Sequence, residues 1–570
     1  MKFEKTAREW ADKTKCENMR NQLLSWIEEG NESAIEDAFF QDLAFGTAGL
    51  RGIIGPGTNR MNANTVARAT QGVADYLNAH YKKPSVAIAH DSRNKGERFT
   101  EITASVLAAN GVTAHVFPRL EPTPALAYAT QFLHCDAGIC ITASHNPKEY
   151  NGYKVFNSKG CQITAQVASD MSDAIKKLDY FDGIKKIDFE DGIKSGKIKW
   201  INDECINSFV KDAVNNVNNI DKDAIKNLCL AYSPLNGTGL EPVTKAFEMI
   251  GVKNVHIVEE QKNPDGNFPT CSKPNPEERS ALELGIKLVD DVDADLLIAT
   301  DPDADRTGIA VRHNGECELV SGNEVGLLMM NHFASQCSRD EIKNKIFCTT
   351  LVSTSMADAL AKYYGFELRR VPTGFKYIGE QITKLEEKRE KNRFVMGFEE
   401  SYGYLVGTHV RDKDSISATV TICDMAAKCK KKGKDLIDAL TALYEEFGYY
   451  KNSTTSYSFP GADGSEKMKN IMARLRGNAP TEIDGKKVVQ FIDYKEETKM
   501  SILNSRDREE QILPRVNVLQ FDLEDEAKVI IRPSGTEPKI KAYTFVKGTS
   551  TDDASKKLEE LNAAVNEYFK

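Results

Sequence analysis

The chain has 570 residues and a formal net charge of −9, with 28% charged and 41% hydrophobic residues. A chain of this length exceeds what one hydrophobic core supports, so several domains are expected. The negative charge disfavours nucleic acid and anionic membranes as partners, and no apolar run approaches the length of a membrane span. The start of the chain lacks the apolar core of a signal peptide, and the 12 cysteines include no C-x-x-C pair. A cytoplasmic protein with reduced thiols is therefore expected.

The order strand, helix, strand occurs three times along the chain. The first repeat has strands over 85–91 and 112–117 with a helical pattern between them. The second has strands over 228–233 and 255–258 around a helix over 241–250, and the third has strands over 346–351 and 367–371 around a helix over 355–364. Each repeat then reaches a further apolar strand, over 137–141, 294–300 and 394–396. This spacing predicts right-handed parallel crossovers, with ligands beyond the carboxyl ends of the strands.

The pattern changes after about Tyr450 to polar turns, a hairpin over 532–546 and a final helix from Asp552. The predicted fold class is α/β: three similar mixed α/β domains with largely parallel sheets, plus a C-terminal α+β domain, around one central cleft. The predicted domains cover 1–212, 213–322, 323–448 and 449–570, and each contains one of the four loops described next.

A small hydroxyl follows the strand at 137–141, in the run Thr142-Ala143-Ser144-His145-Asn146-Pro147. Asn146 and Pro147 break regular structure, and a second turn at Asn151-Gly152 precedes Lys154. A hydroxyl, an imidazole and an ammonium are thus confined to one short loop. Such a serine is a candidate nucleophile or phosphate carrier. The alternative is a polar turn whose serine only caps backbone groups.

Three aspartates follow the strand at 294–300, in the run Asp301-Pro302-Asp303-Ala304-Asp305-Arg306. In extended chain, residues at i, i+2 and i+4 project to one side, so the three carboxylates would gather around a cation. Oxygen ligands without His or Cys suit magnesium. An EF-hand is excluded because arginines occupy its sixth and twelfth positions. The alternative is a solvated acidic loop, although Arg306 is placed as if for a phosphate.

Two further loops follow apolar segments. Gly397-Phe398-Glu399-Glu400-Ser401-Tyr402-Gly403 offers carboxylate and hydroxyl acceptors for sugar hydroxyls, although many acidic loops are only solvated. Arg532-Pro533-Ser534-Gly535-Thr536-Glu537-Pro538-Lys539 combines a guanidinium, two hydroxyls and a glycine, which is the composition of a phosphate cradle. A tight hairpin turn is the alternative for this second loop.

With these four loops the chain resembles the α-D-phosphohexomutase family, and within it the long phosphoglucomutases of bacterial type. The resemblance covers nearly the whole chain and rests on TASHNP with the trailing NGYK, DPDADR, GFEES and RPSGTEP, in the family's order, with FGTAGLRG near the start. Four separate loops in the right order are very hard to obtain by accident.

The resemblance implies a role for each matching residue. It makes Ser144 the phosphoserine, with magnesium held by the phosphorylated Ser144, Asp301, Asp303 and Asp305. Besides Ser144, the catalytic residues it implies are Lys154, Arg51 and His145, of which Arg51 and Lys154 line the reacting phosphate and assist proton transfer. The substrate-binding residues that it implies are Arg306, Thr373, Gly374, Lys376, Glu399, Ser401, Lys413, Arg532, Ser534, Gly535 and Thr536.

Within that set, Glu399 and Ser401 are the expected sugar contacts, and the residues from Arg532 to Thr536 hold the phosphate that is not being transferred. Ser415 departs from the family pattern, because many relatives have glycine after the Lys413-Asp414 pair. That departure puts the geometry of the local turn in doubt but not the chemistry. Arg93 is expected to be a structural ion-pair partner at the end of the first strand.

The implied activity is the interconversion of glucose 1-phosphate and glucose 6-phosphate, with one Mg²⁺ per chain and glucose 1,6-bisphosphate as activator and intermediate. Partners are expected to be small-molecule sugar phosphates, with neither nucleic acid nor membrane, and the chain is expected to be a monomer or a dimer. Alternatives within the family are a phosphomannomutase or a phosphopentomutase. Two others are a magnesium-dependent phosphatase or phosphotransferase with Asp301 as nucleophile, and a non-catalytic sugar-phosphate sensor.

Overall fold

The computed structural model describes residues 2–46, 49–459, 464–497, 499–506, 510–534 and 539–569. The chain divides into two compact units, each built from segments that are not contiguous in sequence. The first unit comprises Met1–Val320, Gly379–Arg389 and Tyr402–Lys430, and the second comprises Ser321–Ile378, Glu390–Ser401 and Lys431–Lys570.

The first unit begins with three helices, α1 (Glu4–Lys13), α2 (Glu17–Glu28) and α3 (Glu32–Phe39). They bury an apolar cluster centred on Trp10, whose ring lies edge-on to Phe39 and Phe181 and 5.0 Å from the Tyr180 ring. The N-terminal helices are thereby anchored to the segment that follows α7 (Ala165–Lys176).

The first sheet has the strand order β1-β5-β4-β2-β3-β6. Its strands β2, β3, β4 and β6 run parallel, whereas β5 runs antiparallel to its neighbours β1 and β4. The strands are β1 (Leu50–Ile53), β2 (Ser85–His90), β3 (Thr113–Val116), β4 (Ala137–Ile141), β5 (Tyr150–Asn157) and β6 (Ile198–Trp200). The helices are α4 (Ala63–His80), α5 (Gly96–Ala109), α6 (Thr123–Phe132), α7 (Ala165–Lys176), α8 (Phe189–Lys194) and α9 (Asp203–Asn215).

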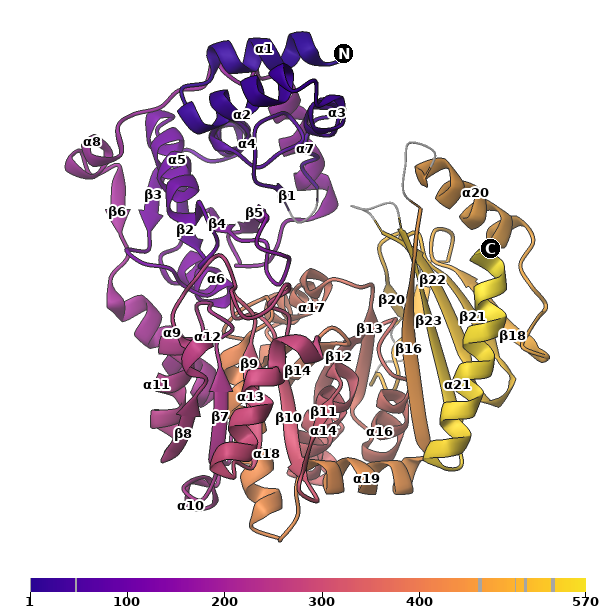
Figure 1. Ribbon diagram of the computed structural model, residues 1–570. Helices are drawn as coiled ribbons and strands as arrows, with labels where there is room; N and C mark the ends of the chain where they lie inside the picture. The colour runs from indigo at the N-terminus through magenta and orange to yellow at the C-terminus, as the bar shows by residue number, and fades with distance from the viewer. Residues whose placement is uncertain are drawn as a thin grey trace. The chain divides into compact units, whose positions relative to one another are not determined.

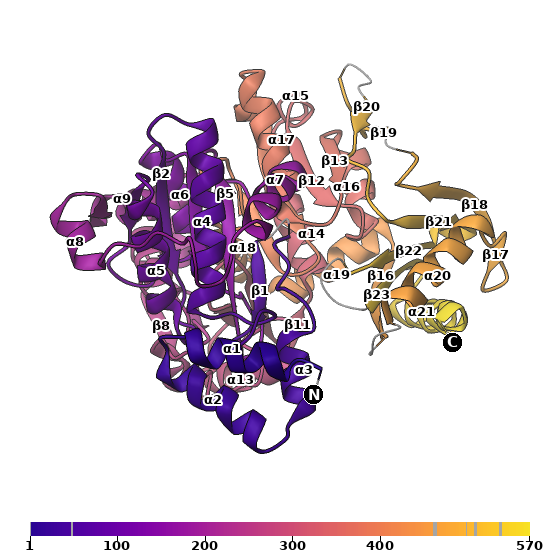
Figure 2. The same cartoon turned by 90° about the horizontal axis from the view of Figure 1, so that it is seen from above.

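Both faces of this sheet are covered, which explains why its central strands read as continuous apolar runs. Val86 and Ile88 of β2 pack into the cluster that contains α4 and α5, which lie side by side (Figure 2). The intervening Ala87 and Ala89 pack on the opposite face against Leu126 and other residues of α6. Because side chains alternate along a strand, the apolar residues of β2 contribute to a hydrophobic cluster on each face of the sheet.

The second sheet of this unit has the order β11-β10-β9-β7-β8, in which β7, β8 and β9 are parallel and β10 and β11 are antiparallel additions. The strands are β7 (Cys229–Ser233), β8 (Asn254–Ile257), β9 (Leu296–Thr300), β10 (Thr307–His313) and β11 (Glu316–Val320). The other elements are α10 (Lys222–Ile225), α11 (Leu240–Ile250), α12 (Glu259–Lys262), α13 (Arg279–Val292), β15 (Gly403–Val406) and α18 (Ser415–Lys430). Helix α18 packs against α9, α10 and α11, although it comes from a much later part of the chain.

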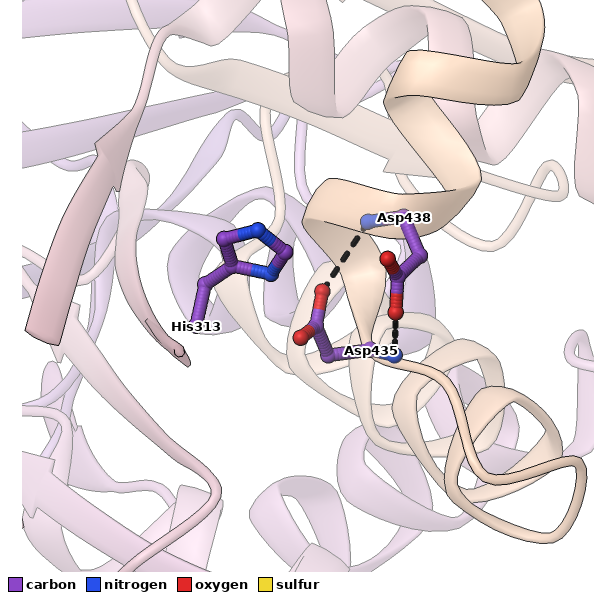
Figure 3. Close-up of side chains that lie close together, drawn as sticks. All are labelled: His313, Asp435 and Asp438. Carbon is purple, nitrogen blue, oxygen red and sulfur yellow. Dashed lines mark hydrogen bonds between the residues drawn. The ribbon is translucent and has the colours of Figure 1, made fainter. Parts of the chain in front are cut away.

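In the second unit, strands β13 and β14 both pair in parallel with β12. Its elements up to residue 447 are α14 (Gly322–Ser335), α15 (Arg339–Ile342), β12 (Ile346–Thr350), α16 (Met356–Tyr364), β13 (Glu367–Val371), the start of α17 (Phe375–Glu387), η1 (Lys391–Arg393), β14 (Phe394–Glu399) and α19 (Leu436–Phe447). Figure 3 shows how α19 begins: the Asp435 carboxylate accepts the N–H of Asp438 at 2.9 Å, and the Asp438 carboxylate accepts the N–H of Asp435 at 3.0 Å. These two acids therefore form a capping box.

The end of the chain forms an antiparallel sheet of order β16-β23-β22-β21-β18-β17, with α21 packed along β16 and β23 (Figure 1). Its strands are β16 (Tyr449–Ser458), β17 (Glu482–Ile483), β18 (Lys486–Asp493), β21 (Leu519–Leu523), β22 (Lys528–Pro533) and β23 (Lys539–Gly548), and β19 (Lys499–Ser501) and β20 (Glu510–Ile512) form a separate pair. The helices are α20 (Gly464–Gly477), η2 (Glu524–Glu526), α21 (Thr551–Asn566) and η3 (Glu567–Phe569).

The fold class predicted from the sequence is confirmed: three α/β segments with mixed, mostly parallel sheets precede an α+β C-terminal segment. The predicted boundaries at 212, 322 and 448 stay predictions. The 12 cysteines all lie within the described residues and are free thiols. Among the helices of the described residues, none has the length and apolar character needed to cross a bilayer.

Candidate active site

The predicted serine lies in the loop directly after β4, with its side chain buried. Ser144 has a φ of 54°, in the left-handed region that residues other than glycine seldom adopt. Its N–H donates to the Thr142 hydroxyl at 2.8 Å, and that hydroxyl in turn donates to Asp91 at 2.5 Å. A buried polar chain thus holds the backbone of Ser144 in an unfavourable conformation.

Arg93 is the main anchor of this loop. Its guanidinium donates to four backbone carbonyls: those of Pro147 at 2.8 Å and Tyr150 at 3.0 Å through Nη1, and those of Ser144 and Asn146 through Nη2. Its Nε lies 3.4 Å from the buried carboxylate of Asp91, which confirms the predicted ion pair. Burial raises the pKa of Asp91 to about 6, against the opposing effect of Arg93.

The aspartate loop follows β9, and here the predicted geometry is wrong. The loop is not extended, because Ala304 has a φ of 47° and its N–H donates to the Asp301 carbonyl at 2.9 Å. The Asp301 carboxylate closes the turn by accepting the N–H groups of Asp305 and Arg306 through Oδ1, at 3.1 and 3.0 Å. The three carboxylates nevertheless converge, since one oxygen of each lies within 4.8 Å of the others. A turn therefore gathers them, rather than the alternation of a strand.

The Ser144 hydroxyl contacts this cluster directly. Its Oγ donates to Asp301 Oδ2 at 2.8 Å and lies 3.2 Å from His145 Nδ1. Burial lowers the pKa of His145 well below its usual range, and the nearby Arg306 and Arg51 lower it further. The imidazole is therefore neutral at pH 7 and can accept a proton at one ring nitrogen.

Two lysines neutralise the other aspartates. Lys154 on β5 donates to Asp303 Oδ2 at 2.7 Å and to Asp305 Oδ2 at 3.3 Å, and Lys413 Nζ lies 3.2 Å from Asp305 Oδ2. Burial acts to raise the pKa of Asp303, but the charge and hydrogen bond of Lys154 outweigh it and hold that pKa below its usual range. Lys154 and Lys413 thus reach Asp303 and Asp305 at Oδ2.

The second oxygens of Asp303 and Asp305 fit a cation. Oδ1 of each is buried and has no hydrogen-bond partner among the described residues. Buried carboxylate oxygens ordinarily have partners, because leaving one without a partner costs free energy. Three converging carboxylate oxygens are the ligands that a hard divalent cation prefers. The aspartates can therefore hold a metal ion.

The two predicted arginines lie beside these loops. Arg51, on β1, donates to the Asn146 side chain at 3.5 Å, and Arg306 lies 3.7 Å from Glu277. Arg51 is exposed and Arg306 is partly exposed, so both guanidinium groups can reach a bound anion. Ser415, whose turn geometry was in doubt, is the first residue of α18, and its hydroxyl donates to the Ala304 carbonyl.

The predicted sugar-binding residues lie in the second unit, around the end of β14. Glu399 is its last residue, and its carboxylate accepts the N–H of Gly374 at 2.7 Å. Lys376 is buried at the start of α17, Thr373 precedes Gly374, and Ser401 is partly exposed in the following turn. The neighbouring Glu400 belongs to the same predicted loop but was given no role of its own. Burial and the negative charge of Glu399 together raise the pKa of Glu400 to about 7. The charge of Arg532 and a hydrogen bond from Thr350 oppose this shift.

The predicted phosphate loop joins β22 to β23. Arg532 pairs with Lys541 in the strand register, and its Nη1 is buried without a hydrogen-bond partner among the described residues. Ser534 N–H donates to the Lys539 carbonyl at 2.8 Å. Gly535 and Thr536 lie outside the described residues.

Thr123 is a residue that the sequence analysis did not find. Its hydroxyl donates to Asp303 Oδ2 at 2.7 Å, although 180 residues separate the two in sequence. The one local signal was the run Glu121-Pro122-Thr123-Pro124, because a hydroxyl between prolines follows a parallel strand at the edge where ligands bind.

Models of three successive domains match the chain: phosphoglucomutase/phosphomannomutase alpha/beta/alpha domain I over 42–181, domain II over 207–315 and domain III over 321–447. A phosphoglucomutase of Staphylococcus aureus is 34% identical over 94% of this chain and 97% of its own length, and that of Staphylococcus saprophyticus is 35% identical over 94% and 98%.

Solved structures agree in fold at lower identity. A putative phosphomannomutase from Thermus thermophilus has a TM-score of 0.68 at 18% identity, covering 92% of this chain and 99% of that one. Parafusin, a phosphoglucomutase from Paramecium, has a TM-score of 0.68 at 18% identity, covering 92% and 94%. The chain therefore belongs to the phosphoglucomutase/phosphomannomutase family of phosphotransfer enzymes, and its full-length similarity favours the phosphoglucomutases within it.

Proposed function

We propose that this enzyme interconverts glucose 1-phosphate and glucose 6-phosphate through a phosphoserine at Ser144. The observation that carries the proposal is the contact of the buried Ser144 hydroxyl with Asp301, at the centre of three convergent carboxylates. A serine placed there is a phosphate carrier beside a cation site, which is what phosphoryl transfer between two hydroxyls of one sugar requires.

The first half of the reaction moves the phosphoryl group from Ser144 to the sugar. The bond from phosphorus to Ser144 Oγ breaks while a bond from phosphorus to the free sugar hydroxyl oxygen forms. The proton of that hydroxyl passes to a base, for which neutral His145 is the candidate, and the product is glucose 1,6-bisphosphate. The second half is the reverse step on the other phosphate, which returns a phosphoryl group to Ser144.

The cationic side chains around Ser144 would spread the charge of the transferring group. Arg51, Arg306 and Lys154 carry this role in the proposal, because fixed cations in a buried site stabilise developing charge strongly. Lys413 would assist through its ion pair with Asp305.

We propose Mg²⁺, one per chain, as the cation of the three aspartates. Asp301, Asp303 and Asp305 would hold it together with the phosphate on Ser144. Bound there, it would withdraw charge from a phosphoryl oxygen.

We propose that the substrate is recognised by residues around the end of β14 and in the loop after β22. Glu399 and Ser401 would bind sugar hydroxyls, with Thr373, Gly374 and Lys376 in the adjacent loop. The phosphate that is not being transferred would be held by Arg532, Ser534, Gly535 and Thr536. The buried Nη1 of Arg532, which has no partner among the described residues, supports an anion at that position.

Glucose phosphates are the proposed substrates because the curated relatives of nearly full length are named phosphoglucomutases. Glucose and mannose differ at carbon 2, and the contacts implied for Glu399 and Ser401 go to hydroxyls that both sugars share. Discrimination is therefore expected to be modest, roughly tens to a few hundredfold. Parallel assays of glucose, mannose and ribose 1-phosphates test this choice, and a higher kcat/KM for mannose or ribose would overturn it.

Mass spectrometry of the protein after incubation with glucose 1,6-bisphosphate tests the mechanism. We expect one phosphate on the peptide that contains Ser144. A phosphate on Asp301 would instead support a phosphatase or phosphotransferase that uses this carboxylate as nucleophile. If neither phosphorylation nor turnover is found, the result would instead support a non-catalytic sugar-phosphate sensor.

A further inference from the structure

Thr123 contacts the aspartate loop twice. It is fully buried as the first residue of α6, its N–H donates to the Asp303 carbonyl at 2.9 Å, and its hydroxyl donates to Asp303 Oδ2 at 2.7 Å. One residue of the first α/β segment thus fixes both the backbone and the side chain of a residue in the second.

These contacts select which oxygen of Asp303 remains available. Oδ2 receives the Thr123 hydroxyl and, also at 2.7 Å, the ammonium group of Lys154. Oδ1 is buried and receives no hydrogen bond from any described residue. Two donors on one oxygen leave the carboxylate a single orientation, in which the other oxygen is free for a cation.

Thr123 is itself rigidly placed. Pro122 before it has a φ of −58° and Pro124 follows it at the helix start, which restricts the backbone on both sides. The N–H of the preceding Glu121 donates to the His90 carbonyl at 3.0 Å and ties this loop to the end of β2. A β-branched threonine also has few accessible rotamers, so its hydroxyl stays directed at Asp303.

We infer that Thr123 is a positioning residue for the metal site: its hydroxyl orients Asp303 so that Oδ1 faces the cation. The inference deepens the proposed function and rests on it only in taking the cation to be Mg²⁺. Hydrogen bonds from an outer residue to a metal-binding carboxylate commonly change metal affinity by about 10- to 100-fold.

The test measures metal binding directly, on the full-length metal-free protein. Mn²⁺, which also prefers oxygen ligands, is titrated and its free concentration followed by electron paramagnetic resonance. Thr123→Val removes the hydroxyl and keeps the shape, so we expect Mn²⁺ to bind about 10- to 100-fold more weakly. Thr123→Ser keeps a hydroxyl at this position, so its Mn²⁺ affinity should lie within about threefold of that of the wild type.

Thr130→Val is the matched control. Thr130 lies on the same helix, is equally buried, and its hydroxyl donates to the Leu126 carbonyl at 2.9 Å instead of to the site. We expect its Mn²⁺ affinity to equal that of the wild type, so that any loss common to both valine variants reports packing alone.

Wild-type Mn²⁺ affinity in Thr123→Val would overturn the inference, as would equal losses in the valine and serine variants. If Thr123→Val does not fold, the smaller Thr123→Ala must show the weaker binding, and normal affinity there also overturns it. Because binding is measured without substrate, failure of this inference is distinct from failure of the proposed mutase activity, which the assays with glucose 1-phosphate decide.

Discussion

Ser144 combines three features that a phosphate carrier needs: a buried hydroxyl, a neighbouring carboxylate and a fixed backbone. Its left-handed φ of 54° costs about 1–2 kcal/mol for a residue with a Cβ atom. Hydrogen bonds from the Ser144 N–H to Thr142 and from Arg93 to the Ser144 carbonyl offset that cost. The strained backbone of Ser144 therefore persists because the surrounding hydrogen bonds hold it, as is common at reactive residues.

Ser144→Ala should lose nearly all mutase turnover and still bind sugar phosphate, because the proposed sugar and phosphate contacts belong to other residues. Steady-state kinetics and calorimetric binding of glucose 6-phosphate measure the two properties separately. A residual rate above about one tenth of wild type, a loss below about 1.4 kcal/mol, would rule out transfer through the serine.

Lys154→Met should destabilise the first unit by about 3–5 kcal/mol without metal, because it leaves the buried carboxylates of Asp303 and Asp305 with less compensation. Mg²⁺ should restore more stability to this variant than to the wild type, since the cation then replaces the missing ammonium. Urea unfolding followed by tryptophan fluorescence suits the measurement, because Trp10, Trp26 and Trp200 all belong to the first unit. Equal stabilisation of both proteins by Mg²⁺ would contradict this prediction.

At the scale of elements, the site is built where loops from several strands are fastened to one another. Arg93, near the end of β2, fixes the loop after β4, and Ser415 at the start of α18 fixes the turn after β9. Loops seldom hold catalytic groups precisely on their own. These hydrogen bonds from Arg93 and Ser415 provide the rigidity that a strand or helix would otherwise supply.

Arg93→Lys should lower kcat at least about tenfold while changing KM little, since misplacement of reacting groups commonly costs turnover. An ammonium group keeps the charge opposite Asp91 but cannot reach four carbonyls at once. Arg60→Lys is the control, because Arg60 is also buried and donates to backbone carbonyls, of Asp37 and Asn59, in the same unit. Matching kinetics in the two variants would show that the Arg93 contacts do not position the loop.

At the scale of the whole molecule, pH should act on the free energy of unfolding through a buried acid that is not one of the three clustered aspartates. Glu121 is buried, with Arg119 Nε 3.2 Å from its carboxylate, and Arg119 also faces Asp203 and Glu241. Burial raises the pKa of Glu121 to about 8 from 4.5, with Arg119 opposing and the two nearby acids adding to the effect. The folded state therefore retains a proton that the unfolded state releases.

Glu121→Gln should remove a loss of stability that the wild type shows as pH rises from about 5 to about 8. In that window the native state binds more protons than the unfolded state, so its unfolding free energy falls with pH, at most by about 1.4 kcal/mol per pH unit for one group. Urea titrations at several pH values, read by tryptophan fluorescence, give both curves. Parallel curves for variant and wild type would show that Glu121 is ionised in the folded protein at neutral pH.

The fold, and the meeting of Ser144 with the three aspartates, could be predicted from the sequence because their signals are local. Ser144 and Asp301 each follow an apolar strand, and parallel strands bring such ends to one edge of a sheet. The shape of the aspartate loop could not be predicted, since it depends on backbone hydrogen bonds to the Asp301 carboxylate. Thr123 was missed for a related reason: its partner lies 180 residues away, and no short pattern encodes that contact.

The first unit is completed late in the chain, and this affects the protein while it is being made. Its last segment, Tyr402–Lys430, carries Lys413 and Ser415, which contact Asp305 and Ala304. A ribosome adding about 5–20 residues per second needs about 5–20 s to pass from Val320 to Lys430. Until Lys413 and Ser415 are added, the nascent chain contains the three aspartates but lacks these two contacts. Strands β12, β13 and β14 of the second unit are therefore synthesised before the carboxylate cluster can be completed.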